Sequence, residues 1–467
     1  MPGTKKSPEF ILGGLNVNKI LQKKGVSKGP KNYYIIPCKQ KELKIRKIKM
    51  AHLPQIITHL SDNDFYKYTM GQMFVHQFHD AKVEWTYKNR DPERKFTQEM
   101  INEINYQIDL YAKLRYTQWE LDNFAKINFM VHDYVGFLKR YTVDRNEITC
   151  KMDEAIQQPE IHFRGYNIDV SYHEVPVMAI VSEVWFRLHY TKAEQDAIIE
   201  DAKKIFLQKL QDLVDGKIDM AAFSEFGTRR RFCKEFQEWM LRTMYEWMQK
   251  YEILRRLFVG TSNVYFSFLF GWSPKGTMAH EAVEVVGQGY PFHNPAWSNY
   301  YMMKAWTKEY GVKNGIYLTD CITTDCFLKD FTDKFATLFG GLRHDSGDPI
   351  EWGEKMLAHY QKLGIDPKTK TLLFSDSLDF ARAAKITAHF KGRCNVAFGI
   401  GTWLLNDTGH FKAMNQVIKL TEVNGIPVCK ISDSAGKFMG KSEVYRDFLQ
   451  RAIDWRVKNE TDFAFRM

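Results

Sequence analysis

The sequence predicts an α/β protein with an irregular (β/α) barrel, an N-terminal α+β domain and C-terminal strands that join the two. Beyond residue 220, short apolar runs alternate with amphipathic segments, which is typical of parallel strands joined by right-handed crossovers. Before residue 216 this alternation is absent. After residue 405 an Asn-Gly pair between two β-rich runs predicts a hairpin. A doubly wound open sheet remains the alternative for the alternating region.

Residues 1–49 differ from the rest in charge. They hold thirteen Lys and Arg against Glu9 and Glu42, a local charge of about +11, whereas the whole chain carries +10. Residues 50–467 are therefore near −1, which argues against a nucleic-acid-binding enzyme. Because the segment mixes Gly, Pro and Lys without amphipathic period, we expect a disordered basic extension. Whether Met50 is the true start stays open.

Composition limits the class of protein further. With 44% hydrophobic and 26% charged residues, the chain reads as an ordinary globular protein. No apolar run approaches the ~20 residues of a membrane helix, so we expect no membrane association. Seven cysteines without paired metal-ligand spacing fit a reducing cytoplasm better than a disulfide framework.

The N-terminal domain is predicted over residues 50–215. Asp62, Asn63 and Asp64 can cap a first helix, and a strand follows at Lys82–Tyr87. Residues 137–175 are rich in β-branched and aromatic types and favour strands. Two helices are expected next, at Pro176–Tyr190 and Lys192–Asp215, with Gly216 closing the second.

The barrel is predicted over residues 216–405, with helices such as Pro349–Leu363, capped by Asp348, between its strands. Residues 406–467 are expected to pack back on the first domain as a hairpin (Val417–Val423 and Ile426–Ile431) and a helix. The predicted barrel strands are Ala221–Phe226, Leu257–Val259, Gly276–Ala279, Ile316–Leu318, Leu338–Leu342, Thr371–Phe374 and Val396–Phe398.

Polar side chains follow all seven predicted strands, at the end where barrel enzymes carry their catalytic groups. Each alone has a structural explanation: His280 and Glu281 could be a satisfied pair, and Asp320 and Asp376 could bind buried backbone. Seven such ends are harder to attribute to chance. They are Gly227–Arg231, Gly260–Asn263, His280–Glu281, Asp320, Arg343–Asp348, Ser375–Asp376 and Gly399–Thr402.

Together these groups predict an enzyme that handles a multiply phosphorylated small molecule. Neutral His280 is nucleophilic near pH 7, and the adjacent Glu281 could fix its tautomer. Three arginines at Arg229–Arg231 would oppose a helix macrodipole unless an anion binds there. The glycine-rich turn Gly399–Thr402 offers backbone N–H groups for phosphate.

Along residues 55–440 the chain resembles the nicotinate phosphoribosyltransferase family. One departure is Ala282, where the bacterial members compared usually carry Trp. The extension before Met50 has no counterpart in this resemblance. The motifs that carry it are Asn63–Met70, Glu225–Arg231, Gly260–Asn263, Gly276–Glu281, Gly341–Pro349 and Phe398–Thr402.

The resemblance implies a homodimeric enzyme of the first step of NAD synthesis from nicotinate. It would join nicotinate to 5-phosphoribosyl 1-diphosphate with Mg²⁺, giving nicotinate mononucleotide and diphosphate while ATP is hydrolysed. His280 would be the residue that ATP phosphorylates. Tyr66 would stack on the pyridine ring, from either this chain or the partner subunit.

The resemblance and the chemistry of the side chains also suggest roles for the remaining candidates. Thr277 and Arg343 would contact nicotinate, and Arg229 and Arg230 would clamp the diphosphate. Asp320 and Asp345 would bind Mg²⁺ or stabilise the sugar. Glu281 belongs to the catalytic set. The substrate-binding set also includes Ser375 and Asp376, with Gly399, Gly401 and Thr402 expected at the sugar 5-phosphate.

Three alternatives stay open. A sister phosphoribosyltransferase would take nicotinamide or quinolinate, and a single carboxylate-binding Arg343 does not settle the substrate. A non-catalytic metabolite-binding homologue would be expected to have lost one of His280, Arg343 or the acidic strand ends. A nucleic-acid-binding protein rests on residues 1–49 alone.

Overall fold

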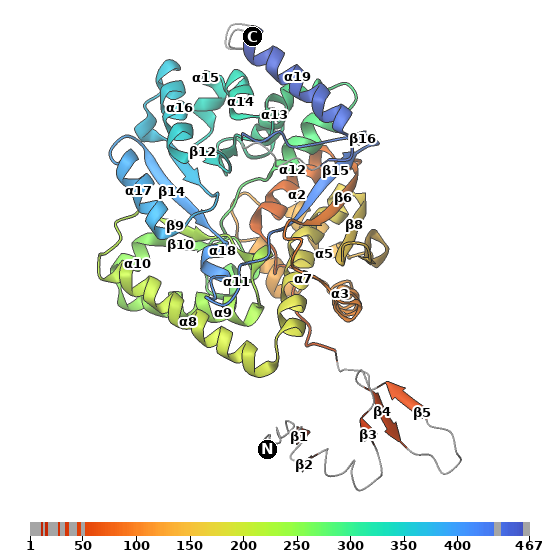
Figure 1. Ribbon diagram of the computed structural model, residues 1–467. Coiled ribbons are helices and arrows are strands. Elements are labelled where there is room, and N and C mark those ends of the chain that lie inside the picture. The colour runs from red at the N-terminus through yellow and green to blue at the C-terminus, as the bar shows by residue number, and fades with distance from the viewer. Residues whose placement is uncertain are drawn as a thin grey trace. The chain divides into compact units, whose positions relative to one another are not determined.

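The computed structural model describes residues 52–433 and 440–460, and within residues 1–51 the backbone of five short strands (Figure 1). The chain divides into two compact units, Met1–Pro54 and Gln55–Met467. In the first unit β1 (Ile11–Leu12) pairs with β2 (Leu15–Asn16), and β4 (Tyr33–Ile36) pairs with β3 (Ser27–Lys28) and β5 (Lys44–Lys47). The predicted disorder of residues 1–49 falls mostly on residues outside the described ones and stays a prediction.

The second unit contains an antiparallel sheet with the order β16-β15-β6-β8-β7. In β6 (Lys82–Asn89) every second residue is buried, as a strand with one covered face requires. Its neighbours are β7 (Ile148–Asp153), β8 (Gln158–Tyr166), β15 (Gln416–Val423) and β16 (Ile426–Pro427). The predicted hairpin is confirmed at its turn: Asn424 and Gly425 have φ of 51° and 78°, the positive values that a two-residue hairpin turn needs. Its second strand ends at Pro427 rather than at the predicted Ile431.

Helices surround this sheet in the first part of the unit. Helix α7 (Glu174–His189) is buried from Glu174 to Phe186, so it forms the centre of the region rather than a surface helix. The region predicted as strand over 137–175 also includes helical turns, because α6 (Asn167–Val170) follows β8 directly. The other helices are α2 (Phe65–Gln77), α3 (Gln98–Tyr111), α4 (Gln118–Phe124), α5 (His132–Arg140) and α8 (Lys192–Val214).

The second sheet is the predicted irregular barrel. Its six strands are all parallel, in the order β10-β9-β14-β13-β12-β11, so β14 closes onto β9 while β10 and β11 do not pair. The strands are β9 (Phe223–Glu225), β10 (Phe258–Thr261), β11 (Ile316–Leu318), β12 (Gly341–His344), β13 (Thr371–Phe374) and β14 (Asn395–Ile400).

The gap in the barrel lies where the sequence predicts a strand at Gly276–Ala279. That prediction is wrong. Gly276 has φ of 140°, outside the range of a strand, and a Cβ at this position would lie 3.3 Å from the amide nitrogen of Tyr66. The segment still bridges the two unpaired strands: the amide of Lys275 donates to the carbonyl of Thr261, and the hydroxyl of Thr277 donates to that of Ile316.

Helices α16 (Pro349–Lys362) and α17 (Phe380–Phe390) lie side by side outside the barrel (Figure 1). Asp348 caps α16, as predicted, by accepting from the amides of Ile350 and Glu351. The remaining barrel helices are η3 (Thr228–Arg230), α9 (Lys234–Lys250), α10 (Glu252–Leu257), α11 (Val264–Leu269), α12 (His280–Val283), η4 (Glu284–Gln288), α13 (Ser298–Tyr310), α14 (Thr324–Asp330), α15 (Asp333–Leu338) and α18 (Thr402–Leu405).

The two parts of the C-terminal region take different places. Strand β15 pairs with β6, as the predicted return to the first domain requires. Helix α19 (Glu443–Asn459) differs from that prediction: it packs on α14 and η5 (Pro295–Trp297), because Leu449 and Ile453 join an apolar cluster with Ile322 and Cys326. The predicted divisions at residues 215 and 405 stay predictions.

Two further sequence expectations concern location. Among the described residues, none of the helices has the length and apolar composition needed to cross a bilayer. The six described cysteines form no disulfide. The cytoplasmic location stays a prediction.

The anchor of α19 gives a stability test. Arg456 is buried against Asp330, with Nη2 2.5 Å and Nη1 3.0 Å from its two oxygens. We expect Arg456→Met to cost about 3–5 kcal/mol of unfolding free energy, because it leaves a buried carboxylate unpaired. Urea denaturation followed by circular dichroism measures this.

The control is Lys192→Ala, which removes an exposed pair with Asp196 and should cost less than about 0.5 kcal/mol. Replacing both partners, Arg456→Met with Asp330→Leu, should recover most of the loss. Equal midpoints for Arg456→Met and Lys192→Ala would contradict the anchoring role.

Candidate active site

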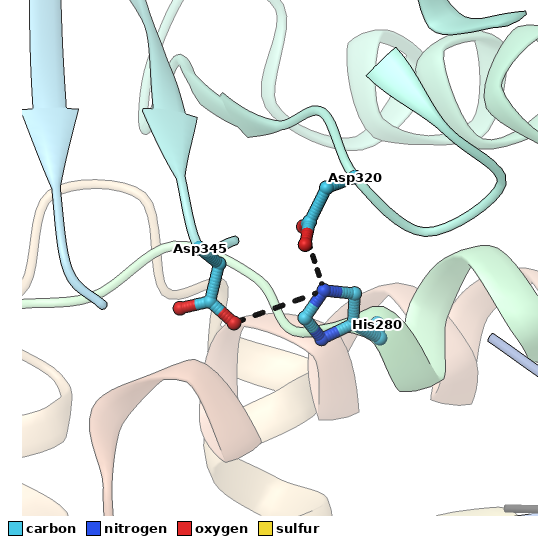
Figure 2. A group of neighbouring side chains, drawn as sticks. All are labelled: His280, Asp320 and Asp345. Carbon is cyan, nitrogen blue, oxygen red and sulfur yellow. Dashed lines mark hydrogen bonds and ion pairs between the residues drawn. The ribbon is translucent and has the colours of Figure 1, made fainter. Parts of the chain in front are cut away.

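The site lies at the carboxyl end of the barrel, where polar groups from neighbouring strands meet (Figure 2). Asp320 follows β11, Asp345 follows β12, and His280 begins α12 after the segment that bridges the barrel gap. Since β11 and β12 pair in parallel, their carboxyl ends lie together. The structure therefore brings together three residues that span 65 positions of the sequence.

His280 is held by a carboxylate and an ammonium group. Its Nε2 lies 2.8 Å from Oδ1 of Asp320 and 2.8 Å from Nζ of Lys430. One ring nitrogen cannot donate and accept at once, so the two contacts belong to alternative tautomers, in which Nε2 donates to Asp320 or accepts from Lys430. Oδ2 of Asp345 is 3.8 Å away.

The surroundings keep the imidazole neutral. Burial lowers the pKa of His280 to about 4, and the charge of Lys430 acts in the same direction while Asp320 opposes it. A neutral ring retains one nitrogen lone pair near pH 7. The histidine is thus suited to act as a nucleophile.

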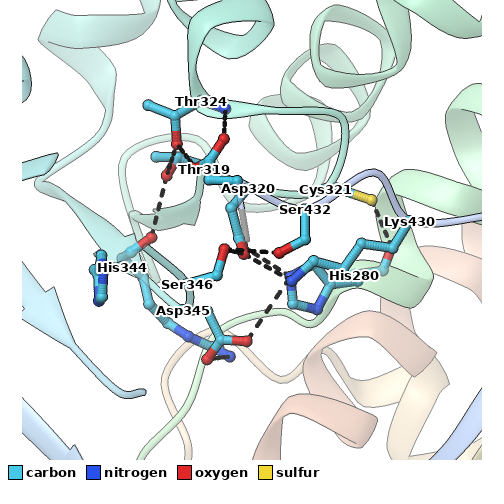
Figure 3. A network of polar contacts seen from close by, with 12 residues as sticks. His280, Thr319, Asp320, Cys321, Thr324, His344, Asp345, Ser346, Lys430 and Ser432 are labelled. Carbon is cyan, nitrogen blue, oxygen red and sulfur yellow. Dashed lines mark hydrogen bonds and ion pairs between the residues drawn. The ribbon is translucent and has the colours of Figure 1, made fainter. Parts of the chain in front are cut away.

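Asp320 is the centre of a wider polar network (Figure 3). Its Oδ2 accepts from Lys430 Nζ at 2.6 Å and from the hydroxyl of Ser346, which in turn accepts from Ser432 at 2.9 Å. Burial alone would raise the pKa of Asp320, but the charge of Lys430 and the hydrogen bond with the imidazole hold it well below its ordinary value. The carboxylate is therefore charged and fixed.

Arg343 lies on β12 and faces the same space. Its Nη1 donates to the carbonyl of Met278 at 2.8 Å, its Nε to Ser375 at 3.0 Å, and its Nη2 to Asp345 at 3.3 Å. The hydroxyl of Ser375 donates to Asp345 at 2.9 Å. Three of the predicted site residues, Arg343, Asp345 and Ser375, therefore form one cluster.

The three consecutive arginines point to different places. Arg231 is buried and makes a bidentate pair with Asp62 at 2.8 and 2.9 Å, so it anchors the turn. Arg229 has a side chain 40% exposed, and its Nη1 is 3.6 Å from Glu174. Arg230 donates at 3.4 Å to the carbonyl of Gln416. Of these three arginines, Arg229 and Arg230 therefore have N–H groups left to bind an anion.

Tyr66 and Thr277 belong to two segments that contact each other, helix α2 and the segment before His280. Tyr66 lies in the first turn of α2, half-buried, and its hydroxyl donates to Glu174 at 3.4 Å. The hydroxyl of Thr277 donates to the carbonyl of Ile316 at 2.7 Å, and the carbonyl of Thr277 accepts from the hydroxyl of Thr69. Helix α2 thus packs directly on the segment that leads to His280.

Glu281 is not placed as the sequence predicts. It follows His280 in a helix, so the two side chains leave the axis about 100° apart. Its Oε2 is 2.6 Å from Nζ of Lys67, and its Oε1 accepts from Asn167 at 3.3 Å. Asp320, rather than Glu281, orients the imidazole.

The predicted phosphate turn follows β14. A Cβ on Gly399 would lie 2.4 Å from the ring of Phe226, and one on Gly401 would lie 2.8 Å from a backbone carbonyl, so both positions require glycine. Thr402 begins α18. Asp376 accepts from the hydroxyl of Ser377 at 3.1 Å. The 5-phosphate role of this turn stays a prediction.

A divalent cation fits this site in part. Ligand atoms of His280, Asp320 and Asp345 lie within 4.8 Å of one another, and carboxylate oxygens suit Mg²⁺. However, both oxygens of Asp320 are engaged by His280, Lys430 and Ser346. Asp345 is therefore the better ligand of the predicted pair, because the contact that its Oδ2 makes among the described residues is a long one, 3.8 Å to the imidazole.

Sequence reasoning missed several residues of the site. Lys430 was included in the predicted hairpin strand, where a single charge in the apolar run Val428–Ile431 was the available signal. Ser432 follows it two positions later. Lys67 and Glu174 are buried ionisable groups on helices, and nothing in their helical pattern marks them as part of the site.

The chain matches family models over most of its length. Residues 221–456 match the model of the Nicotinate phosphoribosyltransferase (NAPRTase) family, and residues 61–182 match the NAPRTase N-terminal domain. A nicotinate phosphoribosyltransferase of Xylella fastidiosa (strain 9a5c) is 37% identical over 401 residues, covering 85% of this chain and 98% of the relative. One of Ectopseudomonas mendocina (strain ymp) is 40% identical over 407 residues, covering 85% and 97%.

Solved structures agree with these matches. The crystal structure of a nicotinate phosphoribosyltransferase from Porphyromonas gingivalis superposes with a TM-score of 0.76 at 31% identity, covering 85% of this chain and 100% of that one. The enzyme of that name from Vibrio cholerae gives 0.78 at 31%, covering 86% and 95%.

The depressed pKa of His280 can be measured directly. In protein with ¹³C-labelled histidine, assigned by difference from His280→Asn, we expect the His280 signal to titrate near pH 4. Lys430→Met should move this midpoint upward, because a cation is removed, while burial keeps it below the ordinary value of 6.5. A wild-type midpoint at or above 6.5 would contradict the neutral imidazole.

The same shift has a consequence for stability. Between pH 6.5 and about 4 the unfolded chain binds a proton at His280 that the native site does not. Its contribution to the free energy of unfolding therefore falls as pH falls through this window. In His280→Asn this part of the pH dependence should disappear.

Proposed function

The chain belongs to the nicotinate phosphoribosyltransferase (NAPRTase) family, and on this premise we propose that it joins nicotinate to 5-phosphoribosyl 1-diphosphate with coupled ATP hydrolysis. The observation that carries the coupling is the buried imidazole of His280 between Asp320 and Lys430. The products of the transfer are nicotinate mononucleotide and diphosphate, which makes this an entry step of NAD synthesis.

In the transfer step, the pyridine nitrogen forms a bond to the anomeric carbon as the carbon–oxygen bond to diphosphate breaks. Positive charge develops on the sugar, so the enzyme gains most by holding the leaving group and aligning the ring. Arg229 and Arg230 have donors for the diphosphate, and Asp345 supplies a negative charge for the sugar. Tyr66 and Arg343 are the proposed contacts of the ring and of its carboxylate.

In the ATP step, a lone pair of His280 attacks the γ-phosphorus, the bond to ADP breaks, and a nitrogen–phosphorus bond forms. Lys430 is 2.8 Å from Nε2 and can balance the charge of the bound phosphoryl group. Asp320 fixes the ring throughout. Water later cleaves the phosphohistidine and releases phosphate.

Mg²⁺, when bound, would neutralise the charge of the diphosphate and of ATP. Asp345 would hold it through Oδ2, and Asp320 would contribute only if Lys430 moved away. A homodimer is proposed as the active form, with Tyr66 serving the ring of its own or of the partner site.

Replacing the histidine tests the coupling. We expect His280→Ala to lose the stimulation of mononucleotide formation by ATP and to retain no label from γ-³²P-ATP, while slow transfer without ATP persists. Mononucleotide is measured by chromatography with and without ATP. The control is His389→Ala, which removes a half-exposed histidine that pairs with Glu354 on the outer helices. Full ATP stimulation in His280→Ala would contradict the proposed role.

The substrate is tested by offering nicotinate, nicotinamide and quinolinate at equal concentrations. We expect nicotinate to be preferred, because Arg343 can pair with a carboxylate and not with a neutral amide. Arg343→Gln should lower kcat/KM for nicotinate by about 100-fold or more, since a charge-assisted hydrogen-bonded pair is lost. Equal rates with nicotinamide in the wild-type enzyme would favour the sister activity instead.

A further inference from the structure

A buried group of charged side chains lies behind the site and has no assigned role. Lys67 is inaccessible to solvent, and its Nζ is 2.7 Å from Oε2 of Glu174 and 2.6 Å from Oε2 of Glu281. It also lies 4.6 Å from the ring centre of Trp85. The ammonium group is thus fixed between two carboxylates and an aromatic ring.

Glu174 contacts three side chains within the described part of the chain. Besides Lys67, it accepts from the hydroxyl of Tyr66 at 3.4 Å, and its Oε1 is 3.6 Å from Nη1 of Arg229. Its side chain is 9% exposed, and burial would raise its pKa, but the charges of Lys67 and Arg229 lower it. One charged carboxylate therefore contacts the proposed ring holder and a proposed diphosphate clamp.

The other end of this group reaches the histidine. Lys67 follows Tyr66 on α2, and Glu281 follows His280 on α12, so the Lys67–Glu281 pair ties the two helix starts together. Asn167 donates to the second oxygen of Glu281 at 3.3 Å. The chain of contacts Arg229–Glu174–Lys67–Glu281 thus runs from the diphosphate clamp to the residue next to the phosphoryl acceptor.

The contacts at the two ends of this series differ in strength. The contact of Arg229 with Glu174 exceeds hydrogen-bond distance, and Arg229 is partly exposed, whereas both contacts of Lys67 are short and buried. A diphosphate accepts bidentate, charge-assisted hydrogen bonds from guanidinium, which are stronger than a 3.6 Å ion pair. An anion can therefore draw Arg229 away and leave Glu174 to Lys67 and the hydroxyl of Tyr66.

We propose that Glu174 is a positioning residue that couples occupancy of the diphosphate site at Arg229 to the setting of His280 through Lys67 and Glu281. The inference rests on the proposed function and adds the path by which ATP cleavage is kept in step with transfer. With the clamp empty, Glu174 divides its charge between Arg229 and Lys67. With it filled, more of the negative charge of Glu174 acts on Lys67, which weakens the hold of Lys67 on Glu281 at the start of α12.

The test compares ADP formed with nicotinate mononucleotide formed in Glu174→Gln, which keeps the shape of the side chain and removes its charge. We expect ADP per mononucleotide to rise by about 5-fold or more over wild type, as for loss of a typical coupling between sites. The single-turnover rate of His280 phosphorylation should stay within about 2-fold. A merely structural role would lower both reactions together and leave their ratio unchanged.

The matched control is Glu183→Gln, because Glu183 is a buried carboxylate on the same helix that binds Arg187 and the amide of Lys234, away from the site. The ratio of ADP to nicotinate mononucleotide formed by Glu183→Gln should equal that of wild type. Glu174→Asp retains the charge with a shorter reach and should restore much of the coupling. If the Gln variant does not fold by circular dichroism, Glu174→Asp is compared with wild type directly. We then expect a ratio above that of wild type, because the shorter side chain cannot reach Lys67 and Arg229 together, and a wild-type ratio would contradict the proposal.

The outcomes separate the two levels of inference. If wild type makes no mononucleotide from nicotinate, or makes it without any response to ATP, the proposed function fails. If wild type is coupled and folded Glu174→Gln has the wild-type ratio, the proposed function stands and the role of Glu174 is overturned.

Discussion

The structure of the site depends on the burial of charged groups around His280. An isolated carboxylate or ammonium group away from water is costly, so Asp320 and Lys430 are stable there only as partners, 2.6 Å apart. Their pairing joins the end of β11 to the segment after β16, and the start of α12 meets both through His280. The hairpin that leaves the barrel to pair with β6 therefore also carries the cation that completes the site.

Much of the barrel could be predicted, because its strands are short apolar runs that end in polar turns. Ile316–Leu318 and Thr371–Phe374 were predicted with their observed bounds, and the Asn424–Gly425 turn fixed the hairpin. The segment Gly276–Ala279 was not predictable by the same rule. Its residues form a short apolar run, but Gly276 has φ of 140°, and the gap in the barrel is bridged by the amide of Lys275 and the side-chain hydroxyl of Thr277. Such tertiary contacts leave no local periodicity.

The candidate site also contains residues that could be predicted from the sequence and residues that could not. The strand-end rule placed Asp320, Arg343, Asp345 and Ser375 near His280, and the structure brings them together. The tautomer-fixing role given to Glu281 was wrong, because adjacency in sequence separates side chains around a helix. Lys430 could not be assigned, since its partners are 110 and 150 positions away. Contacts between residues so far apart in the sequence are set by the packing of the two sheets.

The central claim is that ATP phosphorylates the neutral imidazole of His280 and that the phosphohistidine is hydrolysed when the phosphoribosyl group is transferred to nicotinate. The most direct test is a pulse and chase with γ-labelled ATP and Mg²⁺, followed by rapid quenching and peptide mapping. The account predicts acid-labile label approaching one phosphoryl group per chain on the peptide that contains His280, and its loss when nicotinate and 5-phosphoribosyl 1-diphosphate are added. Absence of label there, or label that persists through product formation, would contradict the account.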